Sequence, residues 1–384
     1  MATIVLLGCE RDGGAWPPLA VLSQELSQRG HTVHTLCDTP IEYAFESTKI
    51  LRIPNPFEST AYLDNIFATD FAQHMKGGEA LESFQNPLVT WAEALAPAVV
   101  SEVRKAGPDL LVGSMFCLPL AVELGQKLGP PVVSLNPGPY VGPNPPRSFA
   151  DDYPGVALWW FEHCVLPPIL QSDHVLHATD QVFDLGFDGL PYNHYYIGPL
   201  IWTPPGSAPS EMAEPGPPWI TASVSMVNQP GEMDLVAAIL EAADGLPARI
   251  LVTAPDHDVS TLTSIPPNVL LTKFVSHAAA LEQSRVLLSH AGHGAVMRAL
   301  WMGVPMVLTP WDRDQLAVAH RAEKLGVARV IDREELDAEI LQRELASALD
   351  DVALHDASQS HHERLQQTNP PALAAELVEE FIAQ

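Results

Sequence analysis

Basic residues are scarce in this chain of 384 residues, which carries 20 lysines and arginines against 47 aspartates and glutamates, a formal net charge of −27. It offers no block of positive side chains to neutralise the phosphates of a nucleic acid or the headgroups of an anionic membrane. We therefore expect neither as a partner. A small anion would have to be held by local groups, such as a helix N-terminus or histidines, because the protein as a whole repels it.

Cysteines and long apolar runs are also scarce. The four cysteines are far apart and form no Cys-x-x-Cys pair: Cys9, Cys37, Cys117 and Cys164. This usage favours buried free thiols over disulfides or a metal framework. No apolar run approaches the roughly 20 residues that span a bilayer. The first residues enter a strand-like segment, Ile4–Leu7, without a signal-peptide pattern. We expect a soluble, cytoplasmic protein.

Short apolar runs do recur, and they alternate with segments of helical periodicity on either side of a stretch, 203–218, that contains six prolines. Such alternation predicts α/β domains with doubly wound parallel sheets, and a proline-rich stretch without an apolar face is typical of a linker. We predict an N-terminal Rossmann-like domain over 1–202, a linker over 203–218, a C-terminal Rossmann-like domain over 219–370 and a terminal helix over 371–384. The predicted strands are Ile4–Leu7, Val33–Leu36, Pro108–Gly113, Pro131–Leu135, Ile220–Val224, Ile250–Thr253, Val269–Thr272, Val286–Ser289, Met306–Thr309 and Arg329–Ile331.

The segment from Ser289 to Gln315 is the most informative part of the chain. An apolar run is followed by Gly292 and Gly294, and apolar residues then continue with helical spacing. This combination predicts a glycine-containing turn at a helix N-terminus, where unpaired backbone N–H groups and the helix dipole favour an anion. His290 adds a side-chain donor. The turn is therefore predicted to hold a diphosphate.

A second loop in the same segment has different chemistry. Gly303–Pro305 ends the helix, a strand covers Met306–Leu308, and a polar loop follows at Pro310–Gln315. Asp314 accepts hydrogen bonds, whereas Gln315 both donates and accepts them, which suits the hydroxyls of a sugar. A diphosphate-binding turn beside a hydroxyl-binding loop predicts a nucleotide sugar as ligand.

These residues resemble the family 1 glycosyltransferases of GT-B fold, of the bacterial natural-product type. The matching residues follow the family signature in order: His290, Gly292, Gly294, Ala299–Leu300, Gly303–Pro305 and Asp314–Gln315. Tyr196–Leu200 is similar to the phrase that closes the N-terminal domain of the family. The resemblance implies two Rossmann-like domains facing across a cleft, with the sugar donor on the C-terminal domain and the acceptor on the N-terminal one. It also implies that the terminal helix crosses back onto the N-terminal domain.

The resemblance implies a set of donor-binding residues. Phe274 takes the place of the aromatic residue that stacks on the nucleotide base, and His277 that of the glutamine beside it. The full set is Ser223, Phe274, Val275, His277, His290, Gly292, His293, Gly294, Ala295, Trp311, Asp314 and Gln315.

The donor region also departs from the family. Ala295 replaces a hydroxyl residue, and Arg298 replaces the glutamate that many members use to bind ribose, so a thymidine diphosphate sugar fits the sequence as well as a uridine one. The histidines suggest zinc, but no ligand spacing typical of zinc accompanies them. We expect no metal, and no cofactor besides the donor itself.

The acceptor hydroxyl needs a base, and the loop after the first strand is its expected source. Gly14 stands where many relatives have a catalytic histidine, whereas Asp12 is similar to the aspartate that another branch uses. We predict Asp12 as the base, with Glu10 in reserve. The alternative is that Asp12 only caps a helix or a turn. Ser114 replaces the aspartate that usually supports the histidine.

Two tryptophans, Trp16 and Trp159, are predicted to bind the acceptor. For Trp159 and the two aromatic residues that follow it, the alternative is packing in the core.

The sequence thus predicts an inverting, metal-independent glycosyltransferase that moves a sugar from a TDP or UDP donor to a hydroxyl of a lipophilic small molecule. The departures at Gly14, Ser114, Ala295 and Arg298 leave an alternative, a catalytically impaired nucleotide-sugar-binding protein of the same fold. An epimerase acting on a nucleotide sugar is a third hypothesis, but the chain lacks the carboxylate-rich group expected for it. The sequence does not fix the oligomeric state, and a homodimer is one option.

Overall fold

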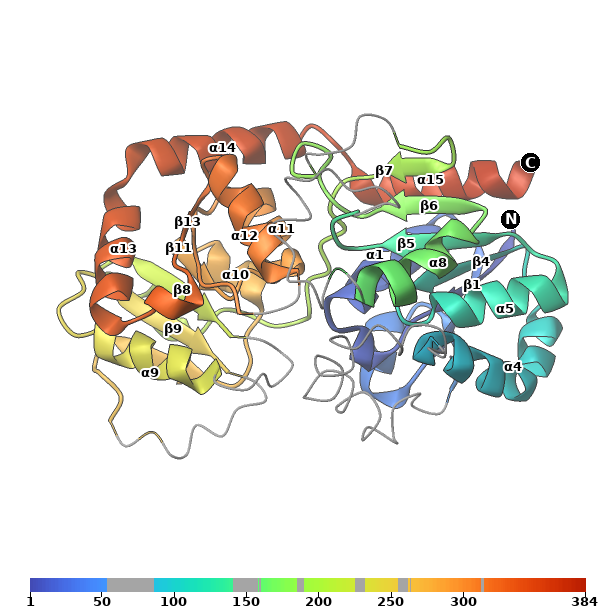
Figure 1. Ribbon diagram of the computed structural model, residues 1–384, viewed down its shortest axis with the longest axis horizontal. Helices are drawn as coiled ribbons and strands as arrows, with labels where there is room; N and C mark the ends of the chain where they lie inside the picture. The colour runs from blue at the N-terminus through green and yellow to red at the C-terminus, as the bar shows by residue number, and fades with distance from the viewer. Residues whose placement is uncertain are drawn as a thin grey trace, which may run out of the picture. The chain divides into compact units, whose positions relative to one another are not determined.

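Figure 1 shows the computed structural model, which describes residues 1–53, 86–140, 158, 160–184, 190–224, 232–254, 262, 264–311 and 314–384, without the side chains of residues 11, 12, 87 and 232. The chain forms two compact units. The first comprises Met1–Thr179, Gly186–Trp202 and Asn369–Gln384, and the second comprises Asp180–Leu185 and Thr203–Thr368. Each unit contains one parallel sheet with helices on both faces, so the predicted α/β class is confirmed.

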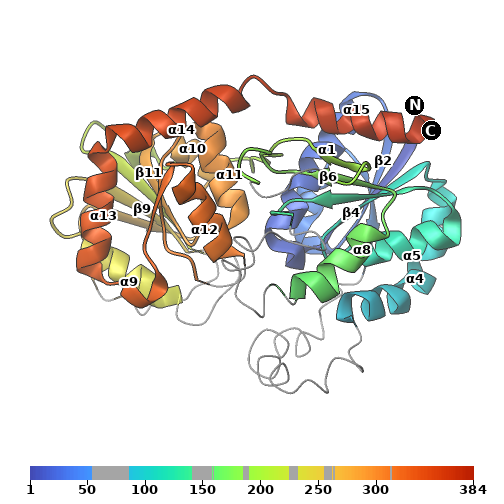
Figure 2. The same cartoon turned by 45° about the horizontal axis from the view of Figure 1, so that its top comes forward.

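The strands of the first unit are β1 (Thr3–Leu7), β2 (Thr32–Cys37), β3 (Lys49–Arg52), β4 (Leu110–Ser114), β5 (Val132–Asn136), β6 (His174–His177) and β7 (His194–Tyr196). They form a seven-stranded parallel sheet in the order β3-β2-β1-β4-β5-β6-β7. The helices are η1 (Glu10–Ala15), α1 (Trp16–Gln28), η2 (Thr39–Phe45), α4 (Pro87–Ala106), α5 (Leu118–Leu128), η3 (Phe161–Val165), α8 (Leu166–Leu170) and α15 (Pro370–Ala383). In Figure 2, α1 and α15 lie on one face of the sheet, and α4, α5 and α8 lie on the other.

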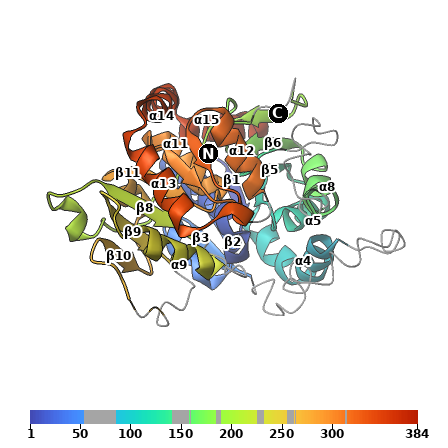
Figure 3. The ribbon, with the colours of Figure 1, turned by 60° about the vertical axis from the view of Figure 1, so that its left-hand side comes forward.

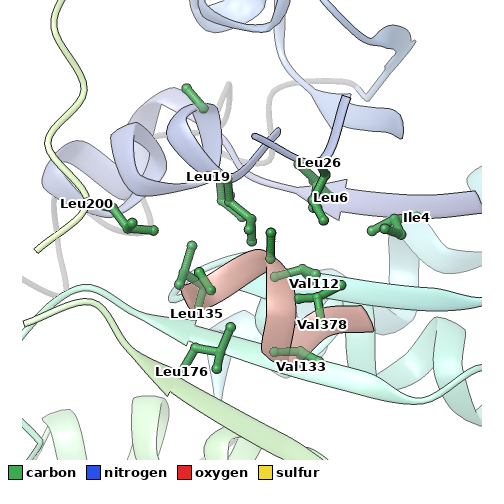
Figure 4. Close-up of a cluster of buried hydrophobic side chains, with 14 of the residues drawn as sticks. Ile4, Leu6, Leu19, Leu26, Val112, Val133, Leu135, Leu176, Leu200 and Val378 are labelled. Carbon is green, nitrogen blue, oxygen red and sulfur yellow. The ribbon is translucent and has the colours of Figure 1, made fainter. Parts of the chain in front are cut away.

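Apolar side chains at alternate strand positions fill the space beneath α1 and α15 (Figure 4). Ile4 and Leu6 of β1 point to the same face, because successive side chains of a strand point in opposite directions. They meet Leu19 of α1, Val112 of β4 and Val378 of α15, all fully buried. Full burial of one such side chain stabilises the fold by about 1.5–3 kcal/mol. The last helix of the chain is therefore part of the first core.

The strands of the second unit are β8 (Trp219–Ser223), β9 (Arg249–Thr253), β10 (Val269–Thr272), β11 (Ser284–Ser289), β12 (Met306–Leu308) and β13 (Ala328–Val330). They form a parallel sheet in the order β10-β9-β8-β11-β12-β13. The helices are α9 (Glu232–Ala242), α10 (His277–Leu281), α11 (His293–Met302), α12 (Gln315–Lys324), α13 (Ala338–Asp350) and α14 (Val352–Leu365), with short turns η4 (Ser210–Ala213) and η6 (Arg333–Glu335). Figure 3 shows α9 and α13 together in front of this sheet, over the core to which both contribute.

All ten predicted strands are present within two residues of their expected bounds, and this part of the prediction is confirmed. Three observed strands, β3, β6 and β7, were not predicted. They are short and carry polar residues at their ends: β6 reads His-Val-Leu-His and β3 reads Lys-Ile-Leu-Arg. Such segments have too little apolar sequence to be recognised alone, and they pair because the neighbouring strand edge offers unpaired backbone groups.

The strand order contains one switch point in each sheet. In the first sheet the chain builds outward from β1 through β2 and β3, and then starts again on the other side at β4. In the second sheet β8 and β11 are the corresponding neighbours. Ligands of open α/β sheets bind outside the carboxyl ends of the strands at such points. The loops after Leu7 and Ser289 therefore occupy the two positions at which the topology favours binding.

Two segments belong to the second unit through contacts that no sequence pattern indicates. The stretch predicted as a linker, 203–218, contributes the buried Met212 to a cluster with Trp219. The segment Asp180–Leu185, which lies within the predicted N-terminal domain, is fixed by Arg321, whose Nη1 donates to Asp184 Oδ1 at 2.5 Å.

Within the described residues, no helix is long and apolar enough to cross a lipid bilayer.

The Asp184–Arg321 ion pair is buried, since the two side chains are 0% and 6% exposed. Asp184→Asn would leave the arginine charge buried without its counterion, which costs about 3–5 kcal/mol in comparable pairs. We expect a clear fall of the urea unfolding midpoint followed by circular dichroism. Lys105→Met is the control, because Lys105 and Glu102 form a pair with side chains 70% and 55% exposed and such pairs contribute little. Equal midpoints for Asp184→Asn and the wild type would contradict the prediction.

Candidate functional site

The connection between β11 and α11 is a tight turn at the switch point of the second sheet. β11 ends at the fully buried Ser289, and α11 begins at His293. Between them Ala291 has a φ of 65° and is the one non-glycine residue with positive φ in the described part of the chain. The left-handed region costs an L-residue about 1–2 kcal/mol, and backbone strain of this kind concentrates at ligand-binding sites.

The N-terminus of α11 is arranged as the sequence predicts for an anion site. Gly292 is the N-cap and provides no side-chain hydrogen bond, and its carbonyl accepts from the N–H groups of Ala295 and Val296 at 3.0 and 3.1 Å. Gly294 is exposed, and a Cβ built there would meet no described heavy atom within 4 Å. The space over the first turn is therefore open to a ligand, toward which the helix dipole presents its positive end.

His290 lies against this turn. Its Nδ1 is 3.4 Å from the carbonyl oxygen of Ser223 at the end of β8, and because a carbonyl only accepts, Nδ1 carries the proton of that contact. A Cβ added to Gly292 would come within 2.7 Å of Nε2 of the same ring. Glycine at 292 thus allows the imidazole to lie close to the backbone of the anion-binding turn.

His277 and Arg298 gather beside His290. The Thr253 hydroxyl donates to the carbonyl of Ala222 at 3.3 Å, so His277 Nε2, at 3.0 Å from that hydroxyl, is the donor to it. Burial, together with the neighbouring charges of Arg298 and His290, lowers the pKa of His277 to about 4. His277 is therefore neutral at pH 7. Burial also lowers the pKa of the Arg298 guanidinium.

The remaining donor candidates on β8 and near α10 differ in exposure. Ser223 and Val275 are 5% and 7% exposed, whereas the Phe274 side chain is 60% exposed. Phe274 is therefore not a core residue, and its ring offers an accessible face for stacking. Its role in base stacking stays a prediction.

The predicted sugar-binding loop is stabilised by its own residues. The Trp311 backbone N–H donates to Gln315 Oε1 at 2.8 Å, and Gln315 is only 3% exposed. The guanidinium of Arg333 lies 4.1 Å from the centroid of the Trp311 ring. Asp314 is the N-cap of α12, but its side chain makes no cap hydrogen bond. Gln315 thus shapes the loop through its carbonyl oxygen, a use of this residue that the sequence did not indicate.

The predicted base lies in the loop after β1, at the switch point of the first sheet. This loop forms η1, which is kinked at Gly13 by a φ of 54°. The side chain of Asp12 lies outside the described part of the structure, and the reserve candidate Glu10 is exposed. Ser114, which replaces the usual aspartate, is fully buried, and its hydroxyl donates to the carbonyl of Leu7 at 3.2 Å. Ser114 therefore helps to hold the end of β1.

Asp38, which was not predicted from the sequence, follows β2 beside this loop. Asp38 is 1% exposed, and its Oδ1 accepts the backbone N–H of Glu10 at 3.0 Å. It is the N-cap of η2 but makes no cap bond there, and within the described residues its buried Oδ2 has no hydrogen-bond partner. Burial raises the pKa of the Asp38 carboxyl, while the bond from Glu10 opposes the rise. The available signal was a polar residue directly after a predicted strand at the carboxyl edge of the sheet.

The two predicted acceptor-binding tryptophans are not brought together by the described structure. Trp16 is 3% exposed, and its ring lies 5.0 Å from that of Trp202 and 6.3 Å from that of Tyr43. The contacts that the structure gives Trp16 are therefore packing contacts. Trp159 lies outside the described residues. Across the described ranges, no group of three or more histidine, cysteine, aspartate or glutamate residues is arranged to hold a metal ion.

Residues 237–380 match the family model of the erythromycin biosynthesis protein CIII-like C-terminal domain. Over 150 residues, or 39% of its length, the chain is 29% identical to the uncharacterized UDP-glucosyltransferase YdhE of Bacillus subtilis, of which the match covers 37%. It is 26% identical over 170 residues to a PGL/p-HBAD biosynthesis rhamnosyltransferase of Mycobacterium bovis, with 44% of this chain and 36% of the relative covered. The matched region thus spans little more than a third of these relatives.

Solved structures match over the whole chain. The glycosyltransferase of kitacinnamycin has a TM-score of 0.77 at 20% identity, with 99% of this chain and 98% of that chain covered. The calicheamicin glycosyltransferase CalG4 has a TM-score of 0.77 at 18% identity, with 100% and 99% covered. The glycosyltransferase VinC, solved with dTDP, has a TM-score of 0.73 at 17% identity, with both chains fully covered. The chain therefore has the GT-B fold, and the predicted resemblance to family 1 glycosyltransferases of the natural-product type is confirmed.

The raised pKa of Asp38 predicts a pH-dependent stability. The folded protein holds the Asp38 proton more tightly than the unfolded chain does, so this carboxyl destabilises the fold increasingly as the pH rises from its ordinary value of 3.8 through the raised pKa. Asp38→Asn keeps an acceptor for Glu10 and removes the buried charge. We expect its urea midpoint to exceed that of the wild type by a margin that grows as the pH rises above about 4 and levels off once the wild-type carboxyl is ionised in the folded protein.

Asp38→Leu is the control, since leucine cannot accept the Glu10 N–H and should lower the midpoint throughout this pH range. A pH-independent difference between Asp38→Asn and the wild type would show that the charge of Asp38 is not the cause.

Proposed function

We propose that this chain, with its GT-B fold and its C-terminal match to the EryCIII-like family, transfers a sugar from a nucleoside diphosphate donor to a hydroxyl of a lipophilic small molecule, with inversion at the sugar carbon. The observation that carries the proposal is the open N-terminus of α11 at the switch point between β8 and β11, with His290 against it. VinC was solved with dTDP, and the spinosyn rhamnosyltransferase SpnG, matched at a TM-score of 0.71, with its spinosyn aglycone.

The reaction needs stabilisation of the leaving diphosphate. Charge develops on the diphosphate oxygens as the bond to the sugar breaks, and the N–H groups of the first turn of α11 are already oriented for them. Nε2 of His290 can donate a further hydrogen bond when the ring is protonated. The net charge of −27 repels an anionic donor, but salt screens this repulsion beyond about 8–10 Å, so the local groups decide binding within the site.

Two further steps are assigned to the remaining candidates. Trp311, Asp314 and Gln315 would orient the sugar, and Asp12 would remove the proton of the acceptor hydroxyl as it attacks, with Glu10 as the alternative base. The proposed chemistry uses no metal and no cofactor besides the donor. A carboxylate would then take the proton of the acceptor, and the helix terminus would stabilise the charge of the leaving diphosphate.

The proposed donor nucleotide is thymidine or uridine diphosphate. Phe274, with its exposed ring, would stack on the pyrimidine. Arg298 is buried beside His277, where a carboxylate would otherwise bind ribose hydroxyls, and this favours the thymidine nucleotide, which lacks the 2′-hydroxyl. Cytoplasmic location and a homodimer stay predictions.

His290→Ala tests the diphosphate site. A lost hydrogen bond to a charged group corresponds to a decrease in affinity of about 10- to 100-fold, which we expect for TDP in titration calorimetry. His355→Ala is a matched control, because His355 in α14 also bonds a backbone carbonyl, that of Ala348 at 3.2 Å. If His290→Ala and the wild type bind TDP equally well, the helix terminus with His290 is not the diphosphate site.

Asp12→Asn tests catalysis separately from binding. Removing a general base lowers turnover by about 10²–10⁴-fold, whereas the affinity for TDP should not change. The measurement is acceptor-dependent release of nucleotide from TDP- and UDP-sugars. Undiminished turnover in Asp12→Asn but not in Glu10→Gln would transfer the role to Glu10. A wild type that binds nucleotide without releasing it, across a panel of hydroxylated aglycones, would support the impaired donor-binding protein instead.

A further inference from the structure

The segment Asp180–Leu185 follows β6 of the first sheet in sequence but clusters with the second unit. It forms a single turn of its own. The Asp184 N–H donates to the Asp180 carbonyl at 2.9 Å, and the Val182 N–H donates to Asp180 Oδ1 at 3.2 Å. Its conformation is thus set by local hydrogen bonds.

Two arginines of the second unit hold this turn. Arg364 of α14 donates to both carboxylate oxygens of Asp180, at 3.0 and 2.5 Å. Arg321 of α12 donates to Asp184 at 2.5 Å in a buried environment. Bidentate and buried pairs of this kind fix orientation as well as position. The turn is therefore anchored to two helices.

Between the two anchors, Phe183 faces the donor site. Phe183 is fully buried, and its ring lies 5.9 Å from the His293 imidazole at an angle of 70°, an edge-to-face arrangement. His293 is the first residue of α11 and is 7% exposed. The imidazole at the entrance of the anion-binding helix is thus held by a ring that does not belong to the sheet or helices of the second unit.

We propose that the turn Asp180–Asp184 is a clasp that positions the donor site, and that Phe183 acts as a positioning residue through His293. By fixing the His293 ring, Phe183 keeps that side chain from entering the open space above Gly294, where the diphosphate of the proposed function would bind. The same clasp holds α12 through Arg321, and α12 begins at Gln315 in the proposed sugar-binding loop. This turn thereby fixes α11 and α12, the two helices that carry the proposed diphosphate and sugar contacts.

A double-mutant cycle tests the clasp. TDP affinity is measured by calorimetry for the wild type, Phe183→Leu, His293→Ala and the double variant. Leucine keeps most of the buried volume but loses the edge-to-face contact. We expect Phe183→Leu to weaken TDP binding about three- to tenfold in the wild-type background, and less than about twofold when His293 is already alanine, because coupled residues are not additive.

Phe381→Leu is the matched control, since Phe381 is also a buried phenylalanine that stacks on a histidine, His174, with ring centroids 3.7 Å apart in the first unit. It should leave TDP affinity unchanged. If Phe183→Leu does not fold, as judged by its thermal melt, Phe183→Met is used in the same cycle.

Equal weakening of TDP binding by the Phe183 substitution in both backgrounds would show a merely structural role and overturn the proposal. Unchanged TDP affinity in Phe183→Leu would overturn it as well. Failure of the wild type to bind TDP or UDP is a different result, which would reject the proposed function rather than the coupling of Phe183 to His293.

Discussion

The site depends on one constraint: a helix must begin where a buried parallel strand ends, at the point where the strand order reverses. β11 brings the chain to that point between β8 and β12, and α11 starts after three intervening residues. The turn is tight enough to place Ala291 in the left-handed region and to require glycine at 292 beside the His290 ring. The backbone amides of a first helical turn favour an anion, and the proposed diphosphate site rests on this property.

Local charge at this site differs from the charge of the molecule. The chain as a whole carries a net charge of −27, whereas Arg298, His290 and His277 cluster near the turn before α11. Burial, with the neighbouring charges, keeps His277 neutral, so His277 can accept or donate a hydrogen bond without adding charge.

The switch point of the first sheet is organised differently. Its loop is held by side chains, with Asp38 on the Glu10 amide and Ser114 on the Leu7 carbonyl. A buried carboxylate with one unsatisfied oxygen, such as that of Asp38, destabilises the fold. Because Asp38 lies beside the loop of the predicted base, this loss of stability accompanies a defined conformation of the loop. The proposed base therefore lies on a loop that is held by residues at the ends of the neighbouring strands β2 and β4.

The sequence by itself determined the alternation of strands and helices, the position of the glycine turn and the resemblance to a glycosyltransferase, because these depend on local periodicity and on motifs whose residues are contiguous. It did not reveal the short strands β3, β6 and β7, the anchoring of Asp38 to Glu10, the use of Gln315 in holding Trp311, or the packing of Phe183 on His293. Each of these joins residues that are distant in sequence or uses an ordinary residue type in an unusual contact. Only the tertiary structure decided them, since burial and hydrogen-bond partners are properties of the packed chain and carry no local pattern.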